Sequence, residues 1–194
     1  MLPLPELKNI HMKKTVFTYG LITGAIAITL MIGSMLLIGG RGGQAPDFDK
    51  GMLLGYTAII LSFVLIYFAQ ASYRDNVGDG YISFGKAFQV GILVTLIASV
   101  LYSLVWVLVA DMVAPDFLEQ YQAYELNKMK EAGASAEAIA KSTAEMNKMA
   151  VEYKKPWVKA AYTFLEPFPV GIVVTLISSF LVRIKNRRSP AVAS

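Results

Sequence analysis

The sequence contains no cysteine and a single histidine, His11. The missing cysteine excludes disulfides, thiolate metal sites and a cysteine nucleophile. A histidine metal site or a Ser-His-Asp triad would have to be built around His11 alone, so we expect no catalytic residue, no metal and no cofactor. Charge is also scarce, at 16% of the 194 residues compared with about a quarter in soluble domains. This scarcity argues against a soluble globule, a disordered chain and a nucleic-acid partner.

Apolar residues are abundant instead, at 55% of the chain. A helix needs about 20 apolar residues to cross the hydrocarbon core of a bilayer. Four stretches are long enough and nearly free of charge: residues 16–38, 52–71, 87–110 and 160–182. Buried helices of a soluble protein are the alternative, but four of them would leave too little polar surface to cover them. The sequence therefore predicts an all-α membrane protein, one membrane domain over 1–194 with four transmembrane helices in the lipid bilayer.

Residues 111–159, between the third and fourth spans, are too many for a loop without structure. One helix is predicted to begin at Pro115, a residue favoured in the first helical turn, and to stop at Gly133. A second is predicted to be capped by Ser135 and to end before Pro156. We therefore expect an extramembrane helical hairpin over about residues 115–155.

Each predicted hairpin helix has one face suited to packing. In the first helix this face holds Phe117, Tyr121 and Tyr124. In the second, heptad spacing relates Ile139, Thr143, Met146, Ala150 and Tyr153. The hairpin is interpreted as a polar-faced spacer, as a docking surface for a partner or as a lid over the bundle, and the sequence leaves these alternatives open.

The distribution of basic residues predicts the orientation, because cytoplasmic segments carry more lysine and arginine. The densest basic cluster follows the fourth span directly and consists of Arg183, Lys185, Arg187 and Arg188. It favours cytoplasmic N- and C-termini. The lysines between the last two spans argue the other way: Lys148, Lys154, Lys155 and Lys159.

Glu166 is the only acidic residue within a predicted span. A charge in lipid is costly, so such residues usually face a bundle interior or a water-filled cavity. Pro167 and Pro169 flank it and leave the carbonyls of Thr163 and Leu165 without their helical donors. A carboxylate, loosened carbonyls and a kink are able to bind a cation or relay a proton. The alternative is that the span begins near Phe168 and that Glu166 lies among the lipid headgroups.

The third and fourth spans resemble each other. Residues 88–99 align without gaps to residues 168–179, with nine of twelve positions identical at an offset of 80. Successive spans run in opposite directions, so the two segments would form an inverted pair. The alternative is chance similarity, because apolar segments are built from few residue types.

Small and aromatic residues suggest how the spans pack. Gly20 and Gly24, and likewise Gly51 and Gly55, have the spacing that allows close helix approach. Aromatic residues near the span ends fit the interfacial belts of membrane proteins: Tyr73, Tyr81, Trp106, Trp157 and Tyr162.

The stretch before and into the third span is distinctive. It reads Tyr73-Arg74-Asp75, then Gly80-Tyr81-Ile82-Ser83-Phe84-Gly85-Lys86-Ala87-Phe88, then Gly91. It resembles the hallmark of a bacterial family known as domain of unknown function 4199. The resemblance extends from about Lys13 to Arg188 and implies a four-span bacterial inner-membrane protein, but it supplies no activity. Arg74 and Lys86 either snorkel to headgroups or form an anion or partner site.

Two functions follow as hypotheses. The favoured one is a non-catalytic structural or assembly component that forms a homo-oligomer or binds an unknown membrane protein through its glycine faces and its hairpin. The other is a small oligomeric transporter or channel that uses Glu166, Thr163 and Pro167 in the kinked fourth helix. A membrane enzyme finds no support, because no paired acids, nucleophile or metal ligands are evident.

Overall fold

The computed structural model describes residues 4–38 and 46–186, and every regular element within them is a helix. Four helical rods are long and apolar enough to cross a membrane: Lys8–Leu36, Phe48–Asn76, Phe84–Val113 and Pro156–Ile184. Each predicted span lies within the helices that form these rods. The predicted all-α fold with four spanning helices is therefore confirmed. Arg187 and Arg188 of the basic cluster lie outside the described residues.

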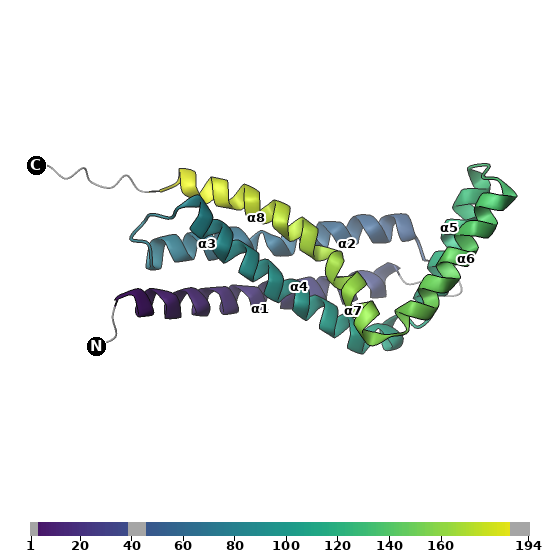
Figure 1. The fold of residues 1–194 in the computed structure, drawn as a ribbon, viewed down its shortest axis with the longest axis horizontal. Coiled ribbons are helices and arrows are strands. Elements are labelled where there is room, and N and C mark those ends of the chain that lie inside the picture. The colour runs from purple at the N-terminus through teal and green to yellow at the C-terminus, as the bar shows by residue number, and fades with distance from the viewer. Residues whose placement is uncertain (1–3, 39–45, 187–194) are drawn as a thin grey trace, which may run out of the picture.

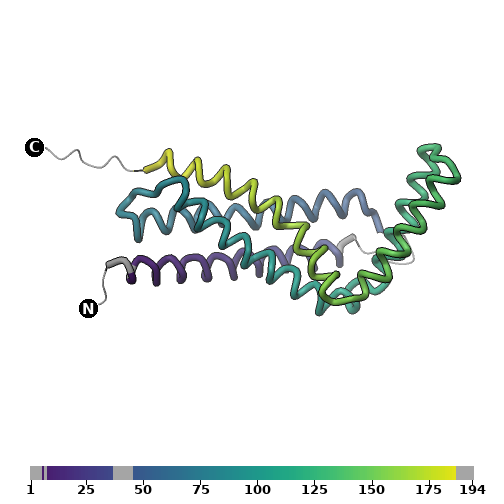
Figure 2. Tube along the Cα trace, in the orientation of Figure 1, coloured from purple at the N-terminus to yellow at the C-terminus, as the bar shows by residue number. Residues whose placement is uncertain are grey.

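The elements in chain order are α1 (Leu4–Ile38), α2 (Phe48–Phe63), α3 (Leu65–Asn76), α4 (Phe84–Val113), α5 (Phe117–Glu131), α6 (Ala136–Tyr153), α7 (Pro156–Leu165) and α8 (Pro167–Ile184). The second rod is α2 continued by α3, and the fourth is α7 continued by α8. Successive rods run antiparallel, so the start of α1 and the end of α8 lie at one end of the bundle, here called the terminal end (Figure 1). The α5–α6 hairpin lies at the opposite end, here called the hairpin end (Figure 2).

The bundle is apolar outside and contains small polar side chains inside. Large apolar side chains on all four rods are exposed, including Leu53, Leu108 and Phe180. Its buried interior instead holds several polar side chains: Thr23, Ser62, Gln70, Thr95, Ser99, Thr175 and Ser179. In water such a surface would be costly, at about 25 cal/mol for each Å² of apolar area. Lipid removes that cost, which agrees with four membrane-spanning helices.

Helix α4 is central and packs closely against α1. A Cβ added at Gly20 would lie 2.8 Å from Ile97 Cγ2, and one at Gly24 would lie 3.1 Å from Leu101 Cδ1. The predicted role of Gly20 and Gly24 in close helix approach is therefore confirmed. The same prediction is wrong for Gly55, because nothing lies within 4 Å of a Cβ built there.

The contact between α4 and α8 is locally two-fold symmetric. The symmetry relates each residue of α4 to the residue of α8 that lies 80 positions later in the sequence. The Thr95 and Thr175 hydroxyls are hydrogen-bonded at 3.1 Å. A Cβ added at Gly171 would overlap the Thr95 methyl group, and one added at Gly91 would lie 2.7 Å from that of Thr175. Each glycine therefore receives the threonine of the other helix, as expected for an inverted pair of like segments.

The distinctive stretch before the third span fastens the terminal end of α8. The Arg74 guanidinium donates to the carbonyls of Val182 and Lys185 at 3.3 and 3.2 Å. The Asn186 side chain pairs with the backbone of Ile82, donating to its carbonyl and accepting from its N–H, each at 3.0 Å. The connecting turn needs small residues, because a Cβ at Gly78 would overlap the Tyr81 carbonyl oxygen.

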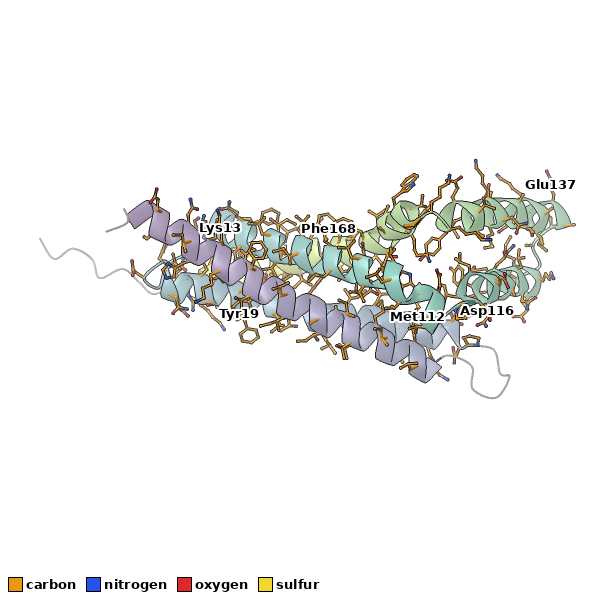
Figure 3. The ribbon with its side chains drawn as sticks, turned by 90° about the horizontal axis from the view of Figure 1, so that it is seen from below. Lys13, Tyr19, Met112, Asp116, Glu137 and Phe168 are labelled. Carbon is orange, nitrogen blue, oxygen red and sulfur yellow. The ribbon has the colours of Figure 1, made fainter. Side chains whose placement is uncertain are left out.

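The hairpin forms largely as predicted. The Ser135 hydroxyl accepts from the Ala138 N–H at the start of α6, and Gly133 in the connection has a φ of +74°. The predicted start at Pro115 is wrong, because α5 begins at Phe117 after a short turn and has Asp116 at its N-cap. Figure 3 shows Asp116 close to the end of α4 and Glu137 near the far tip of the hairpin.

Candidate binding cavity

The fourth rod is interrupted at Glu166. Helix α7 ends at Leu165 and α8 begins at Pro167. The prolines at 167 and 169 lack the N–H groups that would bond the carbonyls of Thr163 and Leu165, so the helical ladder is lost there. Glu166 itself keeps helical dihedral angles, with φ −71° and ψ −60°, so the two helices continue each other closely. The interruption lies about 15 Å from the start of the rod at Pro156, at a rise of 1.5 Å per residue.

Glu166 faces a cavity of about 720 Å³ in the hairpin half of the bundle. The cavity exists because α2 packs against α1 and α8 but makes little contact with α4 and α7. Gly51, Gly55 and Ala58 face this space from α2 and have no large side chain to fill it. The walls come from α1, α2, α4 and α7. At the hairpin end the lining consists of residues 113–117, Gln120 and Tyr121, which include the start of α5.

Among the residues that the structure describes, one donates a hydrogen bond to the carboxylate of Glu166 in the wall of this cavity. The Tyr102 hydroxyl donates to Glu166 Oε2 at 3.4 Å, which is long for such a bond. Tyr102 is itself buried, whereas Glu166 is exposed to the cavity. The neighbouring Thr163 hydroxyl is buried and donates to the Lys159 carbonyl at 2.8 Å. The carboxylate is therefore only partly satisfied by the protein.

Aromatic side chains from five helices line the cavity: Phe48, Tyr56, Tyr102, Trp106, Phe117, Tyr121, Tyr153 and Tyr162. The Trp106 indole N–H donates to the Tyr153 hydroxyl at 2.9 Å and joins α4 to α6. Trp106 is only 5% exposed. Its predicted place in an interfacial aromatic belt is therefore wrong, because the ring is buried against the cavity and the hairpin.

Aromatic packing holds α5 over the cavity. The Phe48 ring at the start of α2 lies 5.9 Å from Phe117, 5.6 Å from Tyr121 and 5.1 Å from Tyr124, between ring centres. The predicted shared face of Phe117, Tyr121 and Tyr124 is thus confirmed, and its partner is Phe48. Such ring pairs are each worth about 0.5–1.5 kcal/mol beyond their buried area.

An ion pair joins the same elements, with Lys128 Nζ 3.2 Å from Asp49 Oδ1. The Tyr124 hydroxyl and the Asp49 carboxylate together raise the pKa of Lys128 above its usual range. Both partners of the pair are more than half exposed. Solvent screens such an exposed pair strongly, so the aromatic contacts stabilise this position of α5 more than the charges do.

The charges of the lining are all of one sign within the described residues. Glu166 and Asp116 are acidic, and no lysine, arginine or histidine lines the cavity. The buried Lys159 on α7 is paired with Asp111 at 2.7 Å, and its amine lies 5.8 Å from the centre of the Tyr153 ring. The cavity therefore presents a negative charge among apolar and aromatic walls.

The residues singled out in the sequence fall into two places. Thr163, Glu166 and Pro167 come together at the interruption of the fourth rod, beside the cavity. Arg74 and Lys86 lie at the terminal end, where Arg74 binds the end of α8 and the Lys86 amine stands 5.6 Å from the centre of the Tyr73 ring. The two groups do not form one site.

Sequence reasoning missed most of the cavity. Tyr102, Phe48 and the small residues of α2 carried no local signal for it, because they meet only when four rods and the hairpin are assembled. In the described residues, no three histidine, aspartate or glutamate side chains are grouped so that they could hold a metal ion.

These features define a four-span, all-α membrane bundle with a helical hairpin before its last span and a cavity beneath that hairpin. The chain belongs to the family described as "Protein of unknown function (DUF4199)", whose model matches residues 18–183. No curated protein matches the chain, and no solved structure matches it.

Proposed function

We propose that the protein is a non-catalytic component of the bacterial inner membrane, with both termini in the cytoplasm, and that it acts by binding. Its ligand is a small amphipathic molecule held in the cavity, and the hairpin serves as the lid rather than as a partner surface. The observation that carries this proposal is the cavity of about 720 Å³, which lies within the usual size range of ligand sites.

The lining supports binding. It is mostly apolar and aromatic and has only a few polar groups, which is the composition typical of small-molecule sites. The aromatic face of α5 is occupied by Phe48 and Trp106 of the same chain. That face is therefore used to cover the cavity and is not free for another protein.

A transporter or channel that uses Glu166 is the second candidate, and the interruption of the fourth rod favours it. Against it stands the packing of the terminal half, where Phe63, Ile66 and Val94 are at most 1% exposed. Phe63 lies one helical turn beyond Ile59, which lines the cavity, and belongs to this packed core. Ion flux in proteoliposomes that Glu166→Gln abolishes would favour transport over binding alone.

The proposal is tested by filling the cavity. Gly55 lines it and has nothing within 4 Å of an added Cβ, so we expect Gly55→Phe to place its ring in this space. Gly33 on α1 also has nothing within 4 Å but does not line the cavity, which makes Gly33→Phe the matched control. Trp106 serves as the reporter once the other tryptophan, the exposed Trp157, is replaced by phenylalanine.

In nanodiscs, 10-bromodecanol is expected to quench Trp106 saturably, because a bromine bound in the cavity lies beside this buried ring. The Gly33→Phe variant should retain that saturable quenching, and Gly55→Phe should lose most of it. Linear, non-saturating quenching of equal size in all three proteins would mean that the bromine acts only from the lipid, and the proposed binding function would be wrong.

A further inference from the structure

We infer that the molecule bound in the cavity carries an organic cation, an ammonium or quaternary ammonium group, that lies between Glu166 and the aromatic rings. This inference rests on the proposed binding function and names its ligand class. The first support is the sign of the charge, since the described lining residues include Glu166 and Asp116 and no basic side chain.

The second support is the incomplete pairing of Glu166. Within the described part of the chain, its one hydrogen bond in the cavity comes from Tyr102 and is 3.4 Å long. Lys159, two helical turns earlier on the same rod, is bound to Asp111 on α4. A carboxylate among apolar walls is costly unless a cation or further donors compensate it. A cationic ligand in the cavity would supply that compensation.

The third support is the aromatic lining. Cations lie favourably over aromatic faces within about 6 Å of the ring centre, and the effect reaches about 2 kcal/mol when the site excludes water. Tyr56, Tyr102, Trp106 and Tyr162 line the cavity together with Glu166. A cavity that is lined by aromatic rings and one carboxylate suits an organic cation, because such a cation is large, weakly hydrated and surrounded by alkyl groups.

A bare metal ion fits this site less well. Calcium takes six to eight oxygen ligands, and magnesium requires a near-octahedral set. Glu166 and the Tyr102 hydroxyl supply only a few oxygens, and the walls around them are mainly carbon. An organic cation needs no such set, because its charge is spread over alkyl groups that the rings contact directly.

The test compares two bromoalkyl probes of the same shape, one ending in trimethylammonium and the other in the tert-butyl group that replaces nitrogen by carbon. Saturable quenching of Trp106 gives a dissociation constant for each, and Gly55→Phe supplies the lipid background. We expect the cation to bind wild-type protein at least about tenfold more tightly after that correction. This ratio needs no substitution at Glu166.

Glu166→Gln should weaken binding of the cation by about tenfold and change binding of the neutral probe by less than about twofold. Retained binding of the neutral probe shows that the variant is folded. Glu119→Gln, which removes the same charge from an exposed site on α5 outside the lining, is the matched control and should change neither constant.

The outcomes separate the two proposals. If neither probe quenches saturably, the binding function itself is wrong. If both bind equally, or if Glu166→Gln weakens both alike, binding stands and the inference of a cationic ligand is overturned.

A second arm identifies the source of the ammonium group. Nanodiscs of phosphatidylglycerol alone are compared with discs that also contain phosphatidylethanolamine. Competition by the latter assigns the ammonium to a lipid headgroup. Unchanged binding assigns it to a free molecule, and either result agrees with the inference.

Discussion

Four residues determine how closely α4 and α8 approach. Gly91 and Gly171 each leave room for a threonine of the opposite helix, and the hydroxyls of Thr95 and Thr175 meet between them. Hydrogen bonds between membrane helices average about 0.6 kcal/mol, so the hydroxyl pair alone contributes modestly. The fit of methyl groups against glycine therefore matters more than the hydrogen bond it surrounds.

Gly171→Ala is expected to lower the free energy of unfolding by about 1–3 kcal/mol, because the added methyl group overlaps Thr95 and lies 2.6 Å from the Phe63 ring. Combining it with Thr95→Ser, which removes the overlapped methyl group and keeps the hydroxyl, should recover part of the loss. Unfolding in mixed micelles measures both. Gly85→Ala, at a position with nothing within 4 Å, should be neutral or stabilising, and an equal loss there would contradict this explanation.

The sequence predicted those features of the hairpin that depend only on neighbouring residues. The cap at Ser135, the glycine at Gly133 and the aromatic face of α5 are read from neighbouring residues, and all three are found. The burial of Trp106 was not predictable in this way, because its hydrogen-bond partner Tyr153 is 47 residues away. The free space at Gly55 was equally hidden, since glycine spacing alone does not say whether a second helix is present.

At the scale of elements, the two ends of α8 differ in what surrounds them. Its start follows the interruption at Glu166, and its last carbonyls accept from the guanidinium of Arg74. A cation is favourable at a helix C-terminus, where the unpaired carbonyls carry partial negative charge. Arg74 is largely buried there, with its side chain 12% exposed, so this contact is less screened than a surface pair. The distinctive stretch before the third span thus has a structural role in positioning the fourth.

Arg74→Ala should therefore loosen the end of α8. Hydrogen bonds to charged groups contribute about 1.5–3 kcal/mol, so we expect a loss of stability in that range. Faster deuterium exchange should be confined to the last turn of α8 and to the turn around Ile82. Arg183→Ala removes an exposed arginine from the same helix and is the control. Equal exchange in the two variants would show that Arg74 does not fasten this end.

At the scale of the whole molecule, the bundle has two unlike halves. In the terminal half the rods pack closely around Phe63, Val90 and Val94, all at most 1% exposed. In the hairpin half α2 stands away from α4 and α7, and the start of α5 lines the space between them. The four spans and their antiparallel order could be predicted from apolar length alone. The separation into a packed half and an open half could not, because it depends on which rods touch.

The two ends of the bundle should face opposite sides of the membrane. Because the sequence has no cysteine, single cysteines report their surroundings without background. Glu137 is exposed near the tip of the hairpin, and Tyr81 is 61% exposed in the turn at the terminal end. The substitutions Glu137→Cys and Tyr81→Cys therefore place one cysteine at each end of the bundle. In spheroplasts, an impermeant maleimide should label the cysteine at 137 directly and the cysteine at 81 only after lysis.

The reverse pattern would place the termini outside and would overturn the orientation while leaving the fold intact. Labelling of both cysteines from one side would be more serious. The third rod, α4, runs from the turn that holds position 81 to the hairpin that holds position 137. Labelling of both positions from the same side would mean that α4 does not cross the bilayer. The four-span arrangement on which the cavity depends would then be wrong.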